Sequence, residues 1–322
     1  MEKVICNKNW GGKYNPYFTI ITPAYNRADT IGRTIRSVEQ QTMYDFEYII
    51  VDDGSTDNID DVVLPFVKST EIPTLYIKKE NGGVHTARNA AIKKARGKLL
   101  INIDSDDELV SNALEKLQNV WESIPDNKKY MYREVVARCK DEKGNEIGGL
   151  FPENINELPW EEAVNACEQT HGEHLGCNVT KVLKENLFPE EEGVTFITEA
   201  ILWDKLFQKY KSWFINDVVR IYHNDGEDHL STALVHPKKT LQTCRNAMFG
   251  SAYVLNNWDI YKSFYSHRTM LLRYCIMKRI LLRHKDKFCQ KWKLKESKDR
   301  TAEMFLKLPS IFLGGLYEKR RM

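Results

Sequence analysis

The 322-residue sequence lacks several patterns that mark common protein classes. Its seven cysteines are scattered and none forms a CxxC pair, so we expect neither a disulfide scaffold nor a zinc ribbon. We expect instead that the protein works in a reducing, cytoplasmic compartment. No apolar run approaches the roughly 20 residues of a membrane span, and no secretion signal is visible at the start of the sequence. Neither GxGxxG nor GxxxxGKS/T occurs, so the fingerprints of dinucleotide-binding and P-loop proteins are missing.

The sequence also lacks a large excess of either positive or negative charge. Lys and Arg total 47 against 45 for Asp and Glu, which gives a net charge of +2 and argues against an overall polyanion binder while leaving room for a local basic patch. Hydrophobic residues make up 42% of the chain, a share typical of a globular protein with one large domain or two smaller ones.

What the sequence does contain is an alternation of short apolar runs and amphipathic stretches over its first third. The runs predict strands, the first of which we expect Pro23 to end, and apolar residues at helical spacing between the runs predict helices. This alternation predicts a mainly parallel sheet with helices on both faces. The predicted strands are 18–22, 46–51, 74–77 and 98–103, and the predicted helices begin near Ile31, Ile59, Gly83 and Ser111.

The rest of the chain is less regular. Strand-like patterns cover 130–140 and 218–222, and helical spacing covers 161–167 and 197–206. From residue 237 onward the pattern is helical and increasingly basic.

Four polar clusters follow predicted strands directly, where ligands bind in sheets of this kind. Each has an ordinary structural interpretation as well, because Asp, Gly, Ser and Thr also form turns and cap helices. The clusters are Thr22–Arg27, Asp52–Asp57, Asn81–Asn89 and Asp104–Glu108.

The last cluster is the most informative. Asp104, Asp106 and their acidic neighbours repel one another, so a compensating cation is expected if their side chains converge. Carboxylate oxygens suit Mg²⁺ or Mn²⁺ when diphosphate oxygens complete the shell; an acidic helix start is the alternative. In the other clusters, Tyr25 offers a face for a base, Arg27 and Arg88 offer charge to a phosphate, and Asp53 can accept an imide N–H such as that of uracil.

Taken together, three segments resemble the family 2 glycosyltransferases with the GT-A fold. They are TIITPAYNRADTIGRTIRSVEQQT, FEYIIVDDGSTD and NGGVHTARNAAIKKARGKLLINIDSDDEL. The resemblance implies a Rossmann-like mixed, mainly parallel sheet with a C-terminal helical extension. It divides the chain into a nucleotide-sugar-binding half (1–125), an acceptor-binding half (126–236) and a basic extension (237–322).

The resemblance also implies roles for individual residues of the donor site. Asp53 would read the uracil ring, Asp104 would lie near the ribose, and Asp106, with Asp104 beside it, would hold Mn²⁺ or Mg²⁺ on the diphosphate. The remaining expected nucleotide-sugar contacts are Pro23, Ala24, Tyr25, Asn26, Arg27, Arg88 and Ser105.

For the catalytic base, the resemblance points to Glu199, although Ala200 stands where relatives carry an aspartate. One carboxylate that takes the acceptor proton and one metal suffice for a direct displacement with inversion. His171, His174 and His229 are interpreted as hydrogen-bonded or exposed histidines rather than zinc ligands, because no further cysteine or carboxylate ligands complete a zinc-binding pattern. The resemblance also implies that His229 lies in a late loop that can close over the diphosphate in relatives.

The basic segment 277–300 interleaves lysines and arginines with apolar residues such as Ile280, Leu281, Leu282, Phe288 and Trp292. Such a helix either lies on an anionic membrane surface or packs on the domain with a solvated basic face. We expect no nucleic-acid partner, since its aromatic residues form no base-stacking platform.

These observations predict a metal-dependent, inverting glycosyltransferase that uses a nucleotide sugar, expected to be UDP-linked. Its acceptor would be a saccharide or lipid-linked saccharide in cell-surface polysaccharide synthesis, with the protein in the cytoplasm or peripheral on the inner face of the membrane. The alternative is a degenerate, non-catalytic protein that binds a nucleotide sugar or a partner, which Ala200 favours.

Overall fold

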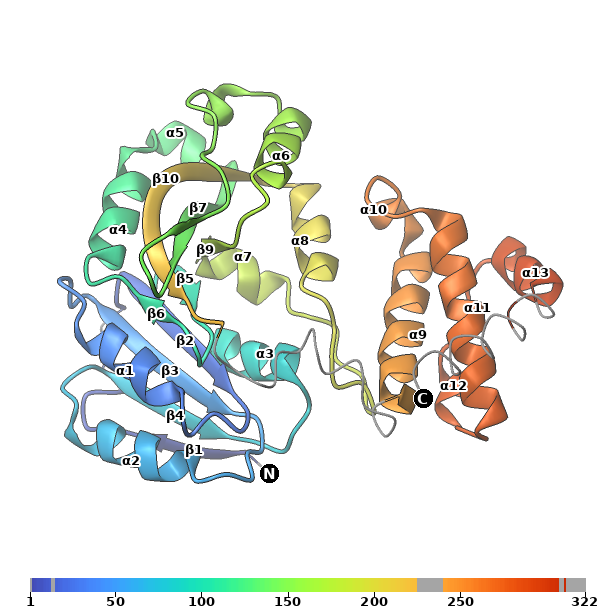
Figure 1. Ribbon diagram of the computed structural model, residues 1–322, viewed down its shortest axis with the longest axis horizontal. Coiled ribbons are helices and arrows are strands. Elements are labelled where there is room, and N and C mark those ends of the chain that lie inside the picture. The colour runs from blue at the N-terminus through green and yellow to red at the C-terminus, as the bar shows by residue number, and fades with distance from the viewer. Residues whose placement is uncertain (1, 13–14, 225–239, 307–309, 311–322) are drawn as a thin grey trace. The chain divides into compact units, whose positions relative to one another are not determined.

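The computed structural model describes residues 2–12, 15–224, 240–306 and 310 (Figure 1). The chain divides into two compact units. The first comprises Met1–Leu187 and Lys209–Gly226, and the second comprises Phe188–Gln208 and Glu227–Met322.

The first unit is built on one mixed sheet of ten strands (Figure 1). Its order is β1-β4-β3-β2-β5-β9-β7-β10-β6, with β8 paired to β7. The neighbours β4, β3, β2 and β5 run parallel, and β7 runs parallel to β10. The strands are β1 (Lys3–Cys6), β2 (Phe18–Ala24), β3 (Phe46–Asp52), β4 (Thr74–Lys78), β5 (Leu99–Asn102), β6 (Glu108–Leu109), β7 (Tyr132–Asp141), β8 (Glu146–Ile147), β9 (His174–Val179) and β10 (Lys211–Tyr222).

The predicted strand–helix alternation is confirmed in the first third of the chain. The helices α1 (Ile31–Glu39), α2 (Ile59–Ser69), α3 (Val84–Lys94) and α4 (Ala113–Ser123) follow the strands in the predicted order. Further along this unit are α5 (Asp126–Lys129), the 3₁₀ helix η1 (Ile155–Glu157), α6 (Trp160–Glu168) and α7 (Thr180–Glu185).

Both faces of the central strands are buried, as the near-continuous apolar runs predict. Phe18 and Ile20 of β2 pack in one core with Ile35 of α1 and Val63 of α2. Successive side chains of a strand point to opposite faces, so Ile21 faces the other side, where α3 packs on β2 and β3.

The prediction that Pro23 ends the first strand is wrong, because β2 continues through Ala24 in register with β3. Asp53 N–H donates to Ala24 C=O (2.8 Å), so Ala24 faces β3 and the polar backbone of Pro23 faces the opposite neighbour, β5. The pairing of β2 with β5 stops at Ile21 and Asn102. The missing N–H of proline therefore costs the sheet no hydrogen bond at this position.

The second unit is helical. Val194, Ile197 and Ile201 share a core with residues of the long helices α9 and α11. Within the described ranges, no helix has the length and apolarity needed to cross a membrane. The helices of this unit are α8 (Ala200–Phe207), α9 (Thr240–Asn256), α10 (Trp258–Tyr261), α11 (His267–Arg283), α12 (Phe288–Lys291) and α13 (Ser297–Phe305).

The basic segment contributes its apolar residues to this core. Ile280, Leu281 and Phe288 are buried among residues of the second unit, whereas Leu282 is 39% exposed. The segment therefore packs on the domain with its basic side chains outward, which is the second of the two arrangements that its sequence allows.

Candidate functional site

The predicted donor-site residues come from strand ends that are neighbours in the sheet. β2, β3 and β5 lie side by side and run parallel, so the loops that follow them meet at one edge. Residues 23–27 follow or end β2, Asp53 follows β3, and residues 104–106 follow β5. The topology thus brings together segments that are spread from residue 23 to residue 106 of the sequence.

The loops after β2 and β3 are joined by hydrogen bonds around Asn26. The backbone N–H of Asn26 donates to Ser55 Oγ (2.9 Å), and Asn26 Oδ1 accepts from the Thr56 N–H (2.8 Å). Asn26 has a φ of 51°, in the left-handed region that asparagine tolerates better than most residues. Beside it, Tyr25 remains 46% exposed and can present its ring to a base.

Asp53 is buried and its two carboxylate oxygens hold the turn before α3. Oδ1 accepts from Lys79 Nζ (2.5 Å) and the Gly82 N–H (3.0 Å), and Oδ2 accepts from the Gly83 N–H (2.7 Å). Gly83 has a φ of 93°, which a side chain would oppose. Asp53 therefore shapes the loop that opens α3. Its predicted contact with uracil stays a prediction.

Asp104 lies between two arginines from distant parts of the chain. Arg88 Nη2 of α3 donates to its Oδ1 (3.2 Å), and Arg220 Nη2 of β10 donates to its Oδ2 (3.3 Å). Burial by itself would raise the pKa of Asp104, but Arg220 and then Arg88 outweigh that effect and lower it. Asp104 is therefore held as a carboxylate, and 38% of its side chain is exposed.

Asp106 is held mainly through its backbone. Arg33 Nε of α1 donates to the Asp106 carbonyl (2.8 Å), while the Asp106 carboxylate faces Arg27 Nε at 3.8 Å. Between the two aspartates, Ser105 is 6% exposed. The carboxylate of Asp106, 20% exposed, thus retains lone pairs for a further partner.

Asp107, which the sequence reasoning left without a role, is the buried anchor of this segment. Arg220 Nε donates to its Oδ2 (2.7 Å) and the His223 N–H donates to its Oδ1 (2.8 Å). Burial raises the pKa of Asp107 to about 6, against the lowering effect of Arg220. The His223 ring in turn lies 2.7 Å from Glu108 Oε1.

Guanidinium groups therefore supply the compensating charge that the acidic cluster was expected to need. Arg27, Arg88 and Arg220 face the carboxylates of the Asp104–Asp107 segment. Arg220 had a signal in the sequence, since it is a charged residue inside the apolar strand pattern 218–222. Nothing in the sequence indicated that it pairs with Asp104 and Asp107, more than 110 residues away.

The acidic segment still fits a divalent metal. Among the described residues, no three His, Cys, Asp or Glu side chains form a group that would hold a metal alone. Mg²⁺ is commonly bound by one or two carboxylates together with substrate phosphates. Asp106 has oxygens to offer such an ion, whereas both oxygens of Asp104 already face arginines.

The predicted base and the histidines have other neighbours in the structure. Glu199 belongs to the second unit, directly before α8, and its Oε2 accepts from Trp203 Nε1 (3.3 Å). His174 packs against the Phe151 ring, and its Nε2 lies 3.1 Å from Thr170 Oγ1, while His171 is exposed in a turn. His229 lies outside the described residues.

Comparison with known proteins finds a similarity to one family. Residues 19–148, less than half of the chain, match the family model described as Glycosyl transferase family 2. This part of the chain is therefore similar to glycosyl transferase family 2. A glycosyltransferase from Rickettsia bellii is 27% identical over 239 residues, 74% of this chain but only 32% of that protein.

Two further similarities each cover about two thirds or more of both chains. The GalNAc(5)-diNAcBac-PP-undecaprenol beta-1,3-glucosyltransferase of Campylobacter jejuni is 29% identical over 222 residues, which is 67% of each protein. The crystal structure of S. aureus TarS 1–349 in complex with UDP-GlcNAc superposes with a TM-score of 0.52 and 18% identity, covering 91% of this chain and 81% of TarS. The chain thus has the GT-A fold that the resemblance in its sequence implies.

Proposed function

We propose that this chain is an inverting family 2 glycosyltransferase that transfers a sugar from a UDP-linked donor to a hydroxyl of a saccharide or lipid-linked acceptor. The observation that carries the proposal is the meeting of the strand-end loops at one sheet edge. There, Tyr25 is exposed and the carboxylates of Asp104 and Asp106 are partly exposed among arginines. The UDP-GlcNAc bound to TarS supports the donor class, and the undecaprenol-linked substrate in the name of the Campylobacter relative supports the acceptor class.

Each residue has a distinct part in this proposal. Tyr25 stacks on the base, Arg88 and Arg27 face the diphosphate, and Asp104 meets the ribose. A Mg²⁺ or Mn²⁺ ion at Asp106 would supply positive charge to the departing diphosphate. Glu199 takes the proton of the acceptor hydroxyl as it attacks, which leads to inversion at the anomeric carbon.

Ligand-induced stabilisation tests the donor. UDP-, GDP- and dTDP-sugars are compared by thermal unfolding, each with Mn²⁺ and with EDTA. At 100 times its dissociation constant, a ligand stabilises the protein by about 2.7 kcal/mol, which corresponds to roughly 5–10 °C for a domain of this size. We expect that shift for UDP-sugars with Mn²⁺. No shift with any nucleotide sugar would contradict the proposal.

Two carboxylate variants then test catalysis. Asp106→Asn is expected to abolish the increase in UDP affinity that Mn²⁺ gives. We expect turnover to be lost as well. Glu199→Gln is expected to bind donor normally and to lose about 10²–10⁴-fold in turnover. Glu192→Gln changes a glutamate that is 95% exposed and serves as the control. Full turnover in Glu199→Gln with bound donor would remove Glu199 from the role of base.

Ala200 favours a second candidate, a non-catalytic protein that binds a nucleotide sugar or a partner. Relatives carry a Glu-Asp pair at the expected place of the base, whereas this chain has Glu199 followed by Ala200, so that only one acidic residue of the pair remains. Measurable sugar transfer by the wild-type chain, lost in Asp106→Asn, would exclude this candidate.

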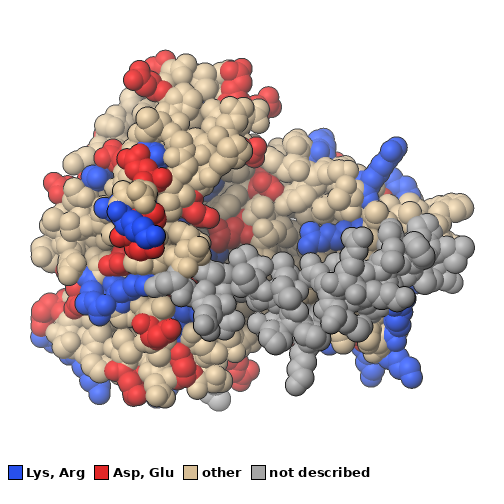
Figure 2. All heavy atoms as spheres, viewed as in Figure 1, with Lys and Arg blue, Asp and Glu red and all other residues tan. Residues whose placement is uncertain are grey.

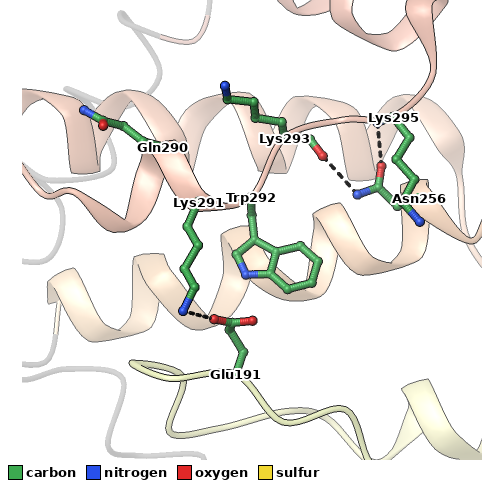
Figure 3. Close-up of a pocket in the computed structure, with 7 residues that line it drawn as sticks. All are labelled: Glu191, Asn256, Gln290, Lys291, Trp292, Lys293 and Lys295. Carbon is green, nitrogen blue, oxygen red and sulfur yellow. Dashed lines mark hydrogen bonds and ion pairs between the residues drawn. The ribbon is translucent and has the colours of Figure 1, made fainter.

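We further propose that the second unit contacts an anionic membrane surface. Its buried apolar side chains leave a lysine-rich exterior, and Lys and Arg side chains project from the α11–α13 part of the face in Figure 2. Figure 3 shows a pocket in this region, where Lys291 pairs with Glu191 and Asn256 holds the backbone of the 293–295 segment. Because the apolar residues are used inside the unit, the contact would be electrostatic and sensitive to salt.

Liposome sedimentation tests this contact with vesicles of neutral lipid and of mixed neutral and anionic lipid. Each lysine near an anionic surface contributes about 1 kcal/mol, so reversing three charges is expected to weaken binding by roughly 100-fold or more. An equal charge change on the first unit is the control, and equal losses from both variants would contradict the assignment. The variants are K291E/K293E/K295E and the control K68E/K143E/K181E, all at exposed lysines.

A further inference from the structure

We propose that Arg220 is a positioning residue of the donor site, which fixes the carboxylates of Asp104 and Asp107 on either side of the Ser105–Asp106 turn. This inference rests on the proposed function and adds to it a residue from the far half of the sequence. Arg220 lies on β10, 116 and 113 residues beyond the two aspartates that it contacts.

The geometry is that of one cation shared by two carboxylates. Arg220 Nη2 reaches Asp104 Oδ2 at 3.3 Å, and both Nε and Nη2 donate to Asp107 Oδ2, Nε at 2.7 Å. The guanidinium is 8% exposed and the Asp107 side chain 1% exposed, whereas Asp104 is 38% exposed. Arg220 therefore connects a buried anchor with a carboxylate that a ligand can reach.

The strand register explains why an arginine of β10 arrives at this turn. β10 pairs antiparallel with β6, with Arg220 opposite Leu109 and Ile221 opposite Glu108. The cross-strand neighbours of Arg220, Leu109 of β6 and Cys139 of β7, both belong to the apolar core, so Arg220 lies on the core-facing side of β10, at a point where the pairing of β10 with β7 is irregular. The acidic turn directly precedes β6, which places its carboxylates within reach of that face.

Other contacts hold the backbone of the same turn. Asp107 N–H donates to the Asp104 carbonyl (3.1 Å), Arg33 Nε donates to the Asp106 carbonyl (2.8 Å), and Thr34 Oγ1 donates to the Asp107 carbonyl (2.7 Å). With the backbone fixed, the orientation of the Asp104 side chain depends on Arg88 and Arg220, together with a longer hydrogen bond from Asn102 Nδ2 to Asp104 Oδ1 (3.4 Å). Removing Arg220 also leaves Asp107 as a buried carboxylate without its guanidinium partner.

A stabilising ion pair without a role in the site is the competing explanation, and the chain offers a matched control for it. Arg96 Nε donates to Glu47 Oε2 (2.7 Å), and Glu47 is fully buried. Arg96 precedes β5 and Glu47 lies at the start of β3, so this pair sits at the amino-terminal edge of the parallel strands. The proposed donor site lies at the carboxyl edge.

The experiment compares Arg220→Lys and Arg220→Met with Arg96→Lys and Arg96→Met in the full-length chain. Affinity for UDP is measured by calorimetry with Mn²⁺ and with EDTA, and unfolding temperature is measured without ligand. Outer-shell partners of metal ligands typically contribute 10–100-fold to affinity, so both Arg220 variants are expected to bind UDP with Mn²⁺ about 10–100-fold more weakly. The Arg96 variants are expected to lose thermal stability but to bind UDP within about twofold of wild type. Arg220→Lys keeps the positive charge and serves if Arg220→Met does not fold.

Three results would overturn the inference. Folded Arg220 variants that bind UDP as tightly as wild type would show that the residue has no part in the donor site. Equal losses of affinity in the Arg220 and Arg96 variants would reduce its role to general stability. Wild-type protein that binds no UDP in either condition would refute the proposed donor itself, and the inference with it.

Discussion

Replacing Asp53 by asparagine separates two roles that the sequence and the structure suggest for this residue. In the structure its carboxylate accepts hydrogen bonds from Lys79, Gly82 and Gly83, and its side chain is 3% exposed. An asparagine keeps one acceptor oxygen and turns an NH₂ group toward donors that need an acceptor. The turn before α3 is therefore expected to lose stability whether or not a nucleotide is present.

The magnitude follows from the number of bonds affected. A hydrogen bond to a charged group contributes about 1.5–3 kcal/mol, and Asp53→Asn weakens one or two of them, so we expect a loss of about 2–5 kcal/mol. At 2–4 °C per kcal/mol for a domain of 150–250 residues, the unfolding temperature should fall by roughly 4–20 °C. Differential scanning calorimetry without ligand measures this change.

Asp57→Asn is the control for the neighbouring loop. Asp57 Oδ2 accepts one hydrogen bond, from the Ala28 N–H (2.8 Å), in an exposed setting, so its replacement is expected to cost less than about 1 kcal/mol. If Asp53→Asn unfolds at the wild-type temperature but binds UDP poorly, Asp53 acts on the ligand alone. The argument that it holds the 82–83 turn would then be refuted.

Three further predictions concern stability. A Cβ at Gly97 would lie 2.4 Å from the Phe18 backbone, so Gly97→Ala is expected to lower the free energy of unfolding by about 1–3 kcal/mol or more in urea titrations; wild-type stability would contradict this. Hydrogen bonds, first of all from Lys129, lower the pKa of Glu122 from 4.5 to about 2. Its unfolded state binds more protons, so its contribution is present above pH 4.5 and is lost as pH falls towards 2, and Glu122→Gln should flatten that part of the stability profile. Leu281 is fully buried, so Leu281→Ala should destabilise the second unit by about 2–5 kcal/mol in lipid-free buffer, whereas an unchanged unit would mean that α11 is not packed there.

Local sequence determined the secondary structure and the placement of the site along the chain. The apolar runs at 18–22 and 46–51 form β2 and β3, and the segment with Ile31 and Ile35 at helical spacing forms α1. The spacing of apolar residues within a short segment is enough to select a strand or a helix, because it decides which conformation puts them on one buried face. The acidic segment 104–107 was placed after its strand for the same reason. Pro23 was the exception, since its fit within β2 depends on where the pairing with β5 stops.

Only the tertiary structure decided which groups meet at that site. Asp53 is a carboxylate after a strand in the sequence, but the fold aims it at the N–H groups of Gly82 and Gly83. Arg220 is a charge within an apolar strand, and the β10–β6 register sets it between Asp104 and Asp107. Such contacts join residues up to 116 positions apart, and no local pattern encodes them because each partner satisfies its own local structure without the other. The energy of these contacts depends on the distance between the charged groups and on their burial, and both are set only when the whole sheet has formed.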